Sequence, residues 1–254
     1  MRMGLPLGGG IGGIVLLLLY SALTGTNPID IVNSGAPTEE TAPTGVPAND
    51  QQAQFISVVL KSTEEVWSQI FSERGARYEP PVLVLFTDAT QSACGVGQSA
   101  MGPFYCPVDR KVYLDLSFFQ ELSRRFGAPG DFAAAYVIAH EIGHHIQSEL
   151  GIEEQVRRKQ QDNPGNANLY SVQLELQADC FAGVWARSTY DRGLLDPGDT
   201  EEGLKAAAAV GDDRLGARSR EQWTHGSSAL RVQWFRTGFD SGKASDCDTS
   251  NVQL

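Results

Sequence analysis

Residues 131–150 read DFAAAYVIAHEIGHHIQSEL, and the rest of the chain is organised around this stretch. It contains no proline, and its apolar positions 132, 135, 136, 139, 142, 146 and 150 recur at steps of three and four residues. That spacing places apolar side chains on one face of an α-helix. We therefore predict a helix here, with Asp131 as its N-cap and Gly151 ending it.

Two histidines and a glutamate lie within this predicted helix. Residues four apart lie one turn above each other, so the imidazoles of His140 and His144 can converge on one divalent cation, which His145 reaches less easily. Glu141 lies about 100° round the helix from His140, where its carboxylate can reach a water on the cation. The alternative is a structural helix that contains these residues by chance. Because the chain has only 4 histidines, such a chance match has a probability on the order of 1% or less.

A second predicted helix, residues 168–190, contains the candidate third ligand. Two histidines leave a catalytic zinc one protein ligand short, and a glutamate from another helix can complete the set. Glu175 is this candidate, and Asp179, one turn along, can accept the N–H of a zinc-bound histidine. An exposed acidic helix face is the alternative. We favour the metal site because apolar residues such as Leu176 and Phe181 surround both carboxylates, which are costly to bury without partners.

A fourth candidate residue, His225, lies between Thr224 and Gly226, where a loop leads into a predicted helix at 229–235. Its ring could donate a hydrogen bond to an oxyanion, bind the metal as an extra ligand, or only cap the helix. These alternatives stay open at the level of the sequence.

The remaining patterns predict a small sheet among several helices, and hence an α+β domain that is predominantly helical. An unbroken apolar run at 82–86 is typical of a buried strand, and the alternating run at 111–116 favours a half-exposed strand. If the second strand lay at the edge of the sheet it could pair with an extended peptide, although a purely structural role is the simpler interpretation. Further helices are predicted over residues 51–71, 117–126 and 153–161 and within 194–218.

The chain begins with a long uncharged segment. No charged residue occurs from Met3 to Ile29, and the stretch from Leu5 to Leu23 approaches the roughly 20 residues that cross a bilayer. We expect an uncleaved membrane anchor at 1–26, with a cleaved signal peptide as the alternative. The prolines of residues 27–50 predict a flexible linker, and 51–254 form the predicted domain. Arg2 should stay in the cytoplasm, which predicts a single-pass membrane protein whose domain is extracytoplasmic.

The net charge bears on possible partners, and the cysteine content bears on the compartment. The formal net charge of -11 and the absence of Lys/Arg clusters argue against nucleic acid as a partner. The 4 cysteines can form two disulfides outside the cytoplasm. Of three pairings, we expect Cys94 with Cys106, which bracket a glycine-rich loop, and Cys180 with Cys247. The alternative for Cys180, inside a helix, is a buried free thiol.

Taken together, these segments resemble the putative neutral zinc metallopeptidase family of bacterial membrane-anchored proteins. The resemblance covers residues 51–248 and implies a zincin-like domain behind an N-terminal membrane segment. It is carried by GPFYCP at 102–107, VYLDL at 112–116, AYVIAHEIGHHIQ at 135–147, ELQADCFAG at 175–183 and THG at 224–226.

The predicted activity is hydrolysis of peptide or protein substrates by a zinc-activated water. Zinc would be held by His140, His144 and Glu175, with Glu141 as general base. Two other functions stay open: a membrane-tethered binding or scaffold protein with a structural zinc, and a zinc hydrolase that acts on a cell-wall amide. A structural zinc usually has four protein ligands, so a fourth ligand such as His145 or His225 would favour the scaffold.

Overall fold

Helices dominate the computed structural model, which describes residues 50–98, 102–124, 130–217 and 219–254. Short strands form a three-stranded sheet and a separate hairpin, so the domain is α+β, as predicted. The elements in chain order are α3 (Gln51–Glu73), β1 (Val82–Phe86), β2 (Ala89–Ser92), β3 (Gly95–Gln98), β4 (Phe104–Cys106), β5 (Lys111–Asp115), α4 (Phe118–Arg124), α5 (Asp131–Glu149), α6 (Ile152–Asp162), η2 (Pro164–Asn166), α7 (Ala167–Asp191), α8 (Asp199–Ala209), α9 (Asp212–Leu215), η3 (Arg220–Gln222), α10 (Ser228–Ser241) and η4 (Ala244–Asp246).

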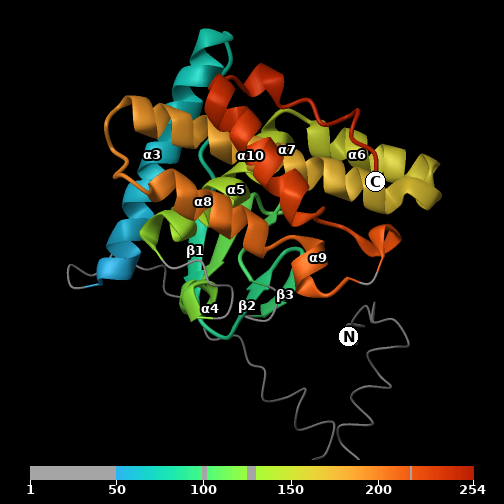
Figure 1. Cartoon of the computed structure of the whole chain (residues 1–254), viewed down its shortest axis with the longest axis horizontal. Helices are drawn as coiled ribbons and strands as arrows, with labels where there is room; N and C mark the ends of the chain where they lie inside the picture. The colour runs from blue at the N-terminus through green and yellow to red at the C-terminus, as the bar shows by residue number, and fades with distance from the viewer. Residues whose placement is uncertain (1–49, 99–101, 125–129, 218) are drawn as a thin grey trace, which may run out of the picture. The chain divides into compact units, whose positions relative to one another are not determined.

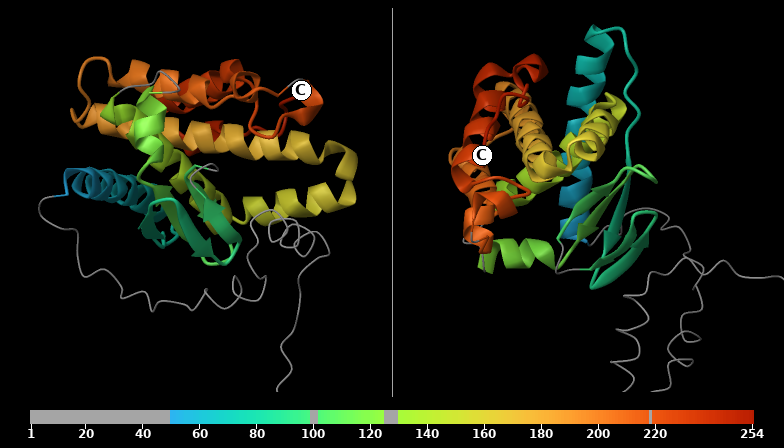
Figure 2. Two further views of the ribbon diagram at one scale, coloured as in Figure 1. Left: turned by 90° about the horizontal axis from the view of Figure 1, so that it is seen from below. Right: turned by 90° about the vertical axis from the view of Figure 1, so that its right-hand side faces the viewer.

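Helix α5, which carries the two candidate histidines, contacts α3, α7, α8 and the sheet (Figures 1 and 2). Gly130 occupies its N-cap position, so Asp131 is the first helical residue and the predicted cap was wrong by one position. A carboxylate in the first turn still stabilises the positive end of the helix dipole. Most of α5 is buried, which holds the two histidines in a rigid frame.

Helix α10 packs along α7, and two glycines permit this close approach (Figure 1). A Cβ at Gly183 would overlap the main chain of α10, and one at Gly238 would overlap the carbonyl of Cys180. Because neither helix carries a side chain at these points, the backbones lie almost in contact. The packing brings Arg231 of α10 beside Asp179 of α7.

The sheet has the order β1-β5-β4, with β1 parallel and β4 antiparallel to β5. Strand β5 is central and buried from Val112 to Asp115, whereas in β1 only Phe86 is buried. The predicted burial of these two strands was therefore wrong in both cases. Because both sides of β5 are paired, it has no free edge, and β1 and β4 are the edge strands instead.

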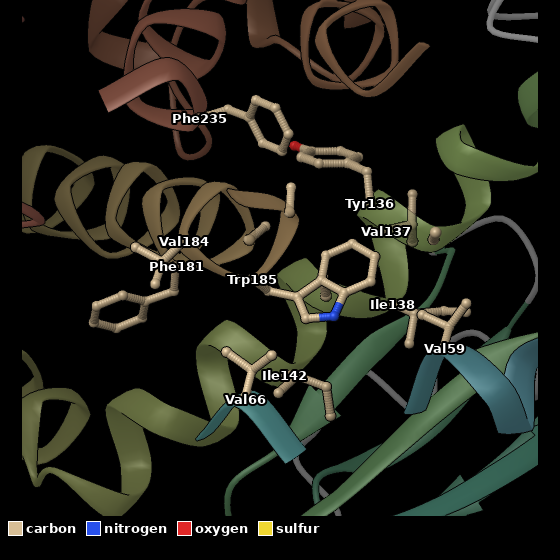
Figure 3. Close-up of a cluster of buried hydrophobic side chains, with 14 of the residues drawn as sticks. Val59, Val66, Tyr136, Val137, Ile138, Ile142, Phe181, Val184, Trp185 and Phe235 are labelled. Carbon is tan, nitrogen blue, oxygen red and sulfur yellow. The ribbon is translucent and has the colours of Figure 1, made fainter. Parts of the chain in front are cut away.

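The hydrophobic core fills the space between α3, α5, α7 and α10 (Figure 3). Trp185 of α7 stacks on Phe132 of α5 with ring centroids 5.7 Å apart, and Phe235 of α10 packs edge-on against Tyr136. Ile142 is fully buried among these elements. Burial of each such side chain contributes on the order of 2 kcal/mol, so the relative position of α5 and α7 is strongly determined.

Both predicted disulfides are present. Cys94–Cys106 joins the β2–β3 hairpin to β4, and Cys180–Cys247 joins α7 to the C-terminal segment. Cys180 is therefore not a free thiol.

The predicted anchor at 1–26 lies outside the described residues, as does the linker at 27–50 except for Asp50, whose side chain caps α3. None of the described helices combines the length and apolar composition needed to cross a bilayer.

Candidate metal centre

Two imidazoles from α5 and one carboxylate from α7 meet in the interior. The Nε2 atom of His140 lies 3.1 Å from Oε2 of Glu175, and Nε2 of His144 lies 3.5 Å from Oε1. One ligand atom from each residue lies within 4.8 Å of the other two. Two neutral imidazoles and a carboxylate are a donor set that zinc prefers, so these residues fit the cation.

A glycine between the two histidines allows α7 to approach α5 closely enough for this cluster. A Cβ built on Gly143 would lie 2.9 Å from the Cα of Ala178 and 2.9 Å from its carbonyl oxygen. Glu175 precedes Ala178 by about one turn of α7. Because Gly143 has no side chain, α5 and α7 lie close enough for the Glu175 carboxylate to reach both imidazole rings.

Asp179 lies behind His140, on the side of the ring away from Glu175. Its Oδ1 lies 2.9 Å from Nδ1 of His140 and accepts a hydrogen bond of 2.5 Å from the hydroxyl of Tyr136. Arg231 donates to both carboxylate oxygens, from Nε at 2.8 Å and from Nη2 at 2.9 Å. An ionised Asp179 accepts the Nδ1 proton of His140, which leaves the Nε2 lone pair for a metal.

His144 has a different partner for its second nitrogen. Its Nδ1 lies 2.9 Å from Oε1 of Gln147, one turn further along α5. As with His140, this contact places the proton on Nδ1 and the free lone pair on Nε2. Both histidines thus present the same nitrogen to Glu175.

The carboxylates make the cluster attractive to a cation. Burial lowers the pKa of His140, but the Asp179 and Glu175 carboxylates outweigh this effect and raise it to about 10. The pKa of His144 is also raised, because Glu175 opposes the effect of burial. Conversely, burial raises the pKa of Glu175, yet the two histidines hold that pKa well below its usual value. The cluster therefore stabilises positive charge, whether a proton or a metal ion supplies it.

A cavity of about 1000 Å³ opens onto these residues. Glu141 lines it and is only 7% exposed, so its carboxylate is shielded from bulk water beside the histidines. Apolar residues form much of the remaining wall. Those from the strand region and its flanks are Pro103, Phe104, Tyr105, Pro107 and Phe118, and those from the helical side are Val137, Leu174, Val210 and Leu215.

His225 lines the same cavity, and Asp212 holds its loop in place. One oxygen of Asp212 accepts the backbone N–H groups of Thr224, His225 and Gly226 at 2.8, 2.7 and 2.8 Å. The other lies 3.2 Å from Nδ1 of His225. The Oγ1 atom of Thr224 also lies 3.1 Å from this Nδ1. The main-chain bonds therefore hold the loop, and the two contacts at Nδ1 leave Nε2 as the available nitrogen of the ring.

His145 faces away from the metal cluster. Its Nε2 lies 2.7 Å from the carbonyl oxygen of Glu79, and its Nδ1 lies 3.2 Å from the hydroxyl of Tyr105. Burial lowers the pKa of His145 to about 4, so the ring stays neutral. Within the described residues, neither His145 nor His225 joins the three-residue ligand group.

Comparison with known proteins identifies the family. The model of the family described as putative neutral zinc metallopeptidase matches residues 2–250. The chain belongs to this family. The protein YpfJ of Escherichia coli (strain K12), itself uncharacterized, is 46% identical to it over 256 residues, which cover 97% of this chain and 89% of YpfJ. An uncharacterized protein of Mycobacterium tuberculosis (strain CDC 1551 / Oshkosh) is 42% identical over 223 residues, 81% of this chain and 73% of that protein. No solved structure matches the chain.

Some residues of the candidate metal centre were predicted from the sequence, and others were not. The structure brings His140, His144 and Glu175 together and places Asp179 beside His140. The contributions of Tyr136, Gln147, Asp212 and Arg231 were not predicted. Arg231 carried a usable signal, because a charged residue among the apolar positions of an amphipathic helix needs a buried partner.

Proposed function

We propose that this chain is a zinc-dependent peptidase whose metal is held by His140, His144 and Glu175. One observation carries the proposal: the Nε2 atoms of both histidines converge on one carboxylate, while their Nδ1 atoms are engaged elsewhere. With three protein ligands, a zinc ion keeps a coordination position for a water or a substrate oxygen.

Zinc bound at these three residues would lower the pKa of a water towards about 7 and polarise the scissile carbonyl. Glu141 is the general base: its shielded carboxylate accepts the proton of the attacking water and passes it to the leaving amine. Its position directly after His140 on α5, at the cavity wall, supports this role.

His225 is proposed as the group that stabilises developing negative charge on the carbonyl oxygen. Asp212 fixes its ring through Nδ1, and a protonated ring would donate Nε2–H to that oxygen. The contacts of Nδ1 with Asp212 and Thr224 leave Nε2 for the substrate, which supports this role. Simple helix capping is less favoured, because Ser227, not His225, is the N-cap of α10.

The substrate is proposed to be a peptide segment in an extended conformation that lies along β4. Phe104 and Tyr105 of β4 line the cavity that also contains Glu141. An edge strand offers main-chain hydrogen bonds to an extended chain, and β4 lies at an edge of the sheet, whereas β5 is central. The largely apolar cavity wall favours peptides with apolar side chains near the cleaved bond.

Two features bear on competing functions. A structural zinc in a scaffold protein would normally have four protein ligands, and within the described residues the cluster offers three. A hydrolase of cell-wall amides would share the metal chemistry and differ only in substrate.

The proposal includes a location. The two disulfides support an extracytoplasmic domain, and the uncharged N-terminal segment supports a membrane anchor.

The test compares the full-length protein with Glu141→Gln and His144→Ala. Zinc content is measured by atomic absorption, and turnover is measured on casein, a peptide library and peptidoglycan fragments. We expect the wild type to bind one zinc and cleave peptides, Glu141→Gln to keep the zinc but lose turnover, and His144→Ala to lose both. Turnover that survives in Glu141→Gln would refute the assigned base, and cleavage of peptidoglycan alone would favour the cell-wall amidase.

A further inference from the structure

Hydrogen-bonded side-chain amides connect His144 with the C-terminal segment, residues Cys247–Val252. Gln147, whose Oε1 faces His144 Nδ1, uses its Nε2 to donate to the carbonyl oxygen of Leu174 at 2.7 Å and to Oε1 of Gln177 at 3.1 Å. Gln177 then donates from Nε2 to the carbonyl oxygen of Cys247 at 2.9 Å. The contacts cross from α5 to α7 and from α7 to the C-terminal segment.

The direction of every bond in this chain follows from its last acceptor. A backbone carbonyl only accepts, so the NH₂ group of Gln177 must face Cys247 and its oxygen must face Gln147. The NH₂ group of Gln147 must then face Gln177 and the Leu174 carbonyl, which turns its oxygen to His144. An amide oxygen also only accepts, so His144 must carry its proton on Nδ1. The lone pair of Nε2 is thereby directed to Glu175.

The end of this amide chain is held firmly. Cys247 is disulfide-bonded to Cys180 of α7 and is only 1% exposed. Thr249 donates to the carbonyl oxygen of Gln173 at 2.6 Å, and Gln173 donates in return to the carbonyl oxygens of Ser250 and Val252, each at 3.1 Å. The acceptor that orients Gln177 therefore has little freedom to move.

We propose that Gln147 and Gln177 are positioning residues for the metal ligand His144, and that the C-terminal segment Cys247–Val252 is a working part of the metal site. The inference rests on the proposed zinc-binding role of His144. Gln147 is itself 1% exposed, so water does not readily replace its amide oxygen as the acceptor. Loss of the amide chain leaves the His144 ring free to rotate or to change tautomer, which weakens its bond to the metal.

Gln173 provides a matched control for the alternative that these glutamines only tie the C-terminal segment to α7. It lies one turn before Gln177 on the same helix and also donates to main-chain carbonyls of the segment. Of the two glutamines, only Gln177 also accepts a hydrogen bond from Gln147, which in turn contacts His144. A purely structural tie predicts equal effects at both positions, whereas the proposal predicts an effect on the metal only at Gln177.

The experiment replaces each glutamine by methionine in the full-length protein, because methionine keeps the side-chain length but removes the polar groups. The zinc dissociation constant is measured by competition with a chromophoric chelator, and the free energy of unfolding by urea titration. We expect the dissociation constant to rise about 10- to 100-fold in Gln147→Met and about fivefold in Gln177→Met. In Gln173→Met it stays within about twofold of wild type, although the urea midpoint falls.

A fourth variant, Gln147→Glu, separates metal affinity from stability. Its carboxylate still accepts the Nδ1 proton of His144 but cannot donate to Leu174 or Gln177. We expect it to bind zinc at least as tightly as wild type while being less stable.

The proposal is overturned if Gln147→Met binds zinc like the wild type, or if Gln173→Met weakens zinc binding as much as Gln177→Met does. If the wild type itself binds no zinc, the proposed function fails first, and the two failures are therefore distinguishable.

Discussion

Arg231 is the buried cation that keeps Asp179 ionised beside His140. Burial raises the pKa of Asp179, but the Arg231 guanidinium and His140 outweigh this effect and hold it below its usual value. Asp179 is completely buried and Arg231 is 2% exposed, so each charge depends on the other. The contact joins residues 52 positions apart, which is why no local pattern in the sequence predicts it.

Removal of the Arg231 guanidinium should therefore lower the stability of the protein. We predict that Arg231→Met lowers the free energy of unfolding by about 3 kcal/mol, because a buried carboxylate loses its main partner. The double variant Asp179→Asn/Arg231→Met should recover part of that loss, since no unpaired charge then remains. Urea titrations of the wild type, Arg231→Met and the double variant at pH 7 measure both effects. A double variant that is less stable than Arg231→Met would contradict this account.

His145 should make the protein sensitive to acid. Its pKa is about 4 in the folded protein, below the unfolded value of about 6.5. The neutral ring therefore stabilises the fold above about pH 6.5, and this stability is lost as the pH falls towards 4. Between pH 6.5 and 4.5 the free energy of unfolding should fall by about 2 kcal/mol. His145→Gln should remove this part of the pH dependence of urea unfolding, and an unchanged pH dependence would count against it.

At the level of elements, the crossing of α5 and α7 depends on Gly143. Alanine has a higher helix propensity by about 1 kcal/mol, but its Cβ would lie 2.9 Å from the Ala178 main chain, which cannot move aside as a side chain could. Overpacking of this kind costs about 1–3 kcal/mol. We predict a net destabilisation in Gly143→Ala, together with weaker zinc binding, because the helices must separate and Glu175 moves with α7.

Gly165 is a suitable control for this substitution. Its nearest neighbour would lie 3.8 Å from an added Cβ, so Gly165→Ala should leave zinc affinity unchanged. Thermal unfolding and chelator competition on both variants test the prediction. If Gly143→Ala proved as stable as wild type and bound zinc equally well, the close approach would not be limiting.

The helices were more predictable from the sequence than the strands, for a physical reason. The period of α5 is a local property of residues 131–149, so it can be read without knowledge of the partners. Strand burial depends on which elements surround the strand, and β5 is buried because β1 and β4 pair with it on both sides while α4 and α5 contact it. The strands at Ala89–Ser92 and Gly95–Gln98 escaped prediction because glycine and polar residues give them no apolar alternation.

The same distinction applies to the candidate site. His140 and His144 are a local pair at helical spacing, and Glu175 with Asp179 is another, so both pairs could be found in the sequence. What joins the pairs is tertiary packing. The amide of Gln147 meets Gln177 only because α5 and α7 cross, and the sequence contains no pattern that marks such a contact.

For the molecule as a whole, the two disulfides act on different parts of the fold and over different lengths of chain. Cys180–Cys247 spans 67 residues and secures the C-terminal segment, whereas Cys94–Cys106 spans 12 residues and connects the β2–β3 hairpin to β4. A disulfide stabilises mainly by restricting the unfolded chain, and the restriction grows with loop length. The expected contributions are about 4 and about 3 kcal/mol.

These differences predict two separable phenotypes. Cys180→Ser/Cys247→Ser should lose the larger stability in urea unfolding and should also bind zinc less tightly, because the Cys247 carbonyl no longer orients Gln177. Cys94→Ser/Cys106→Ser should keep its zinc affinity. Because that bridge anchors the proposed peptide-binding strand, its loss should raise KM for a peptide substrate more than it lowers kcat. Zinc competition, urea titration and steady-state kinetics on the two variants distinguish these outcomes, and equal zinc affinities in both variants would detach the C-terminal segment from the metal site.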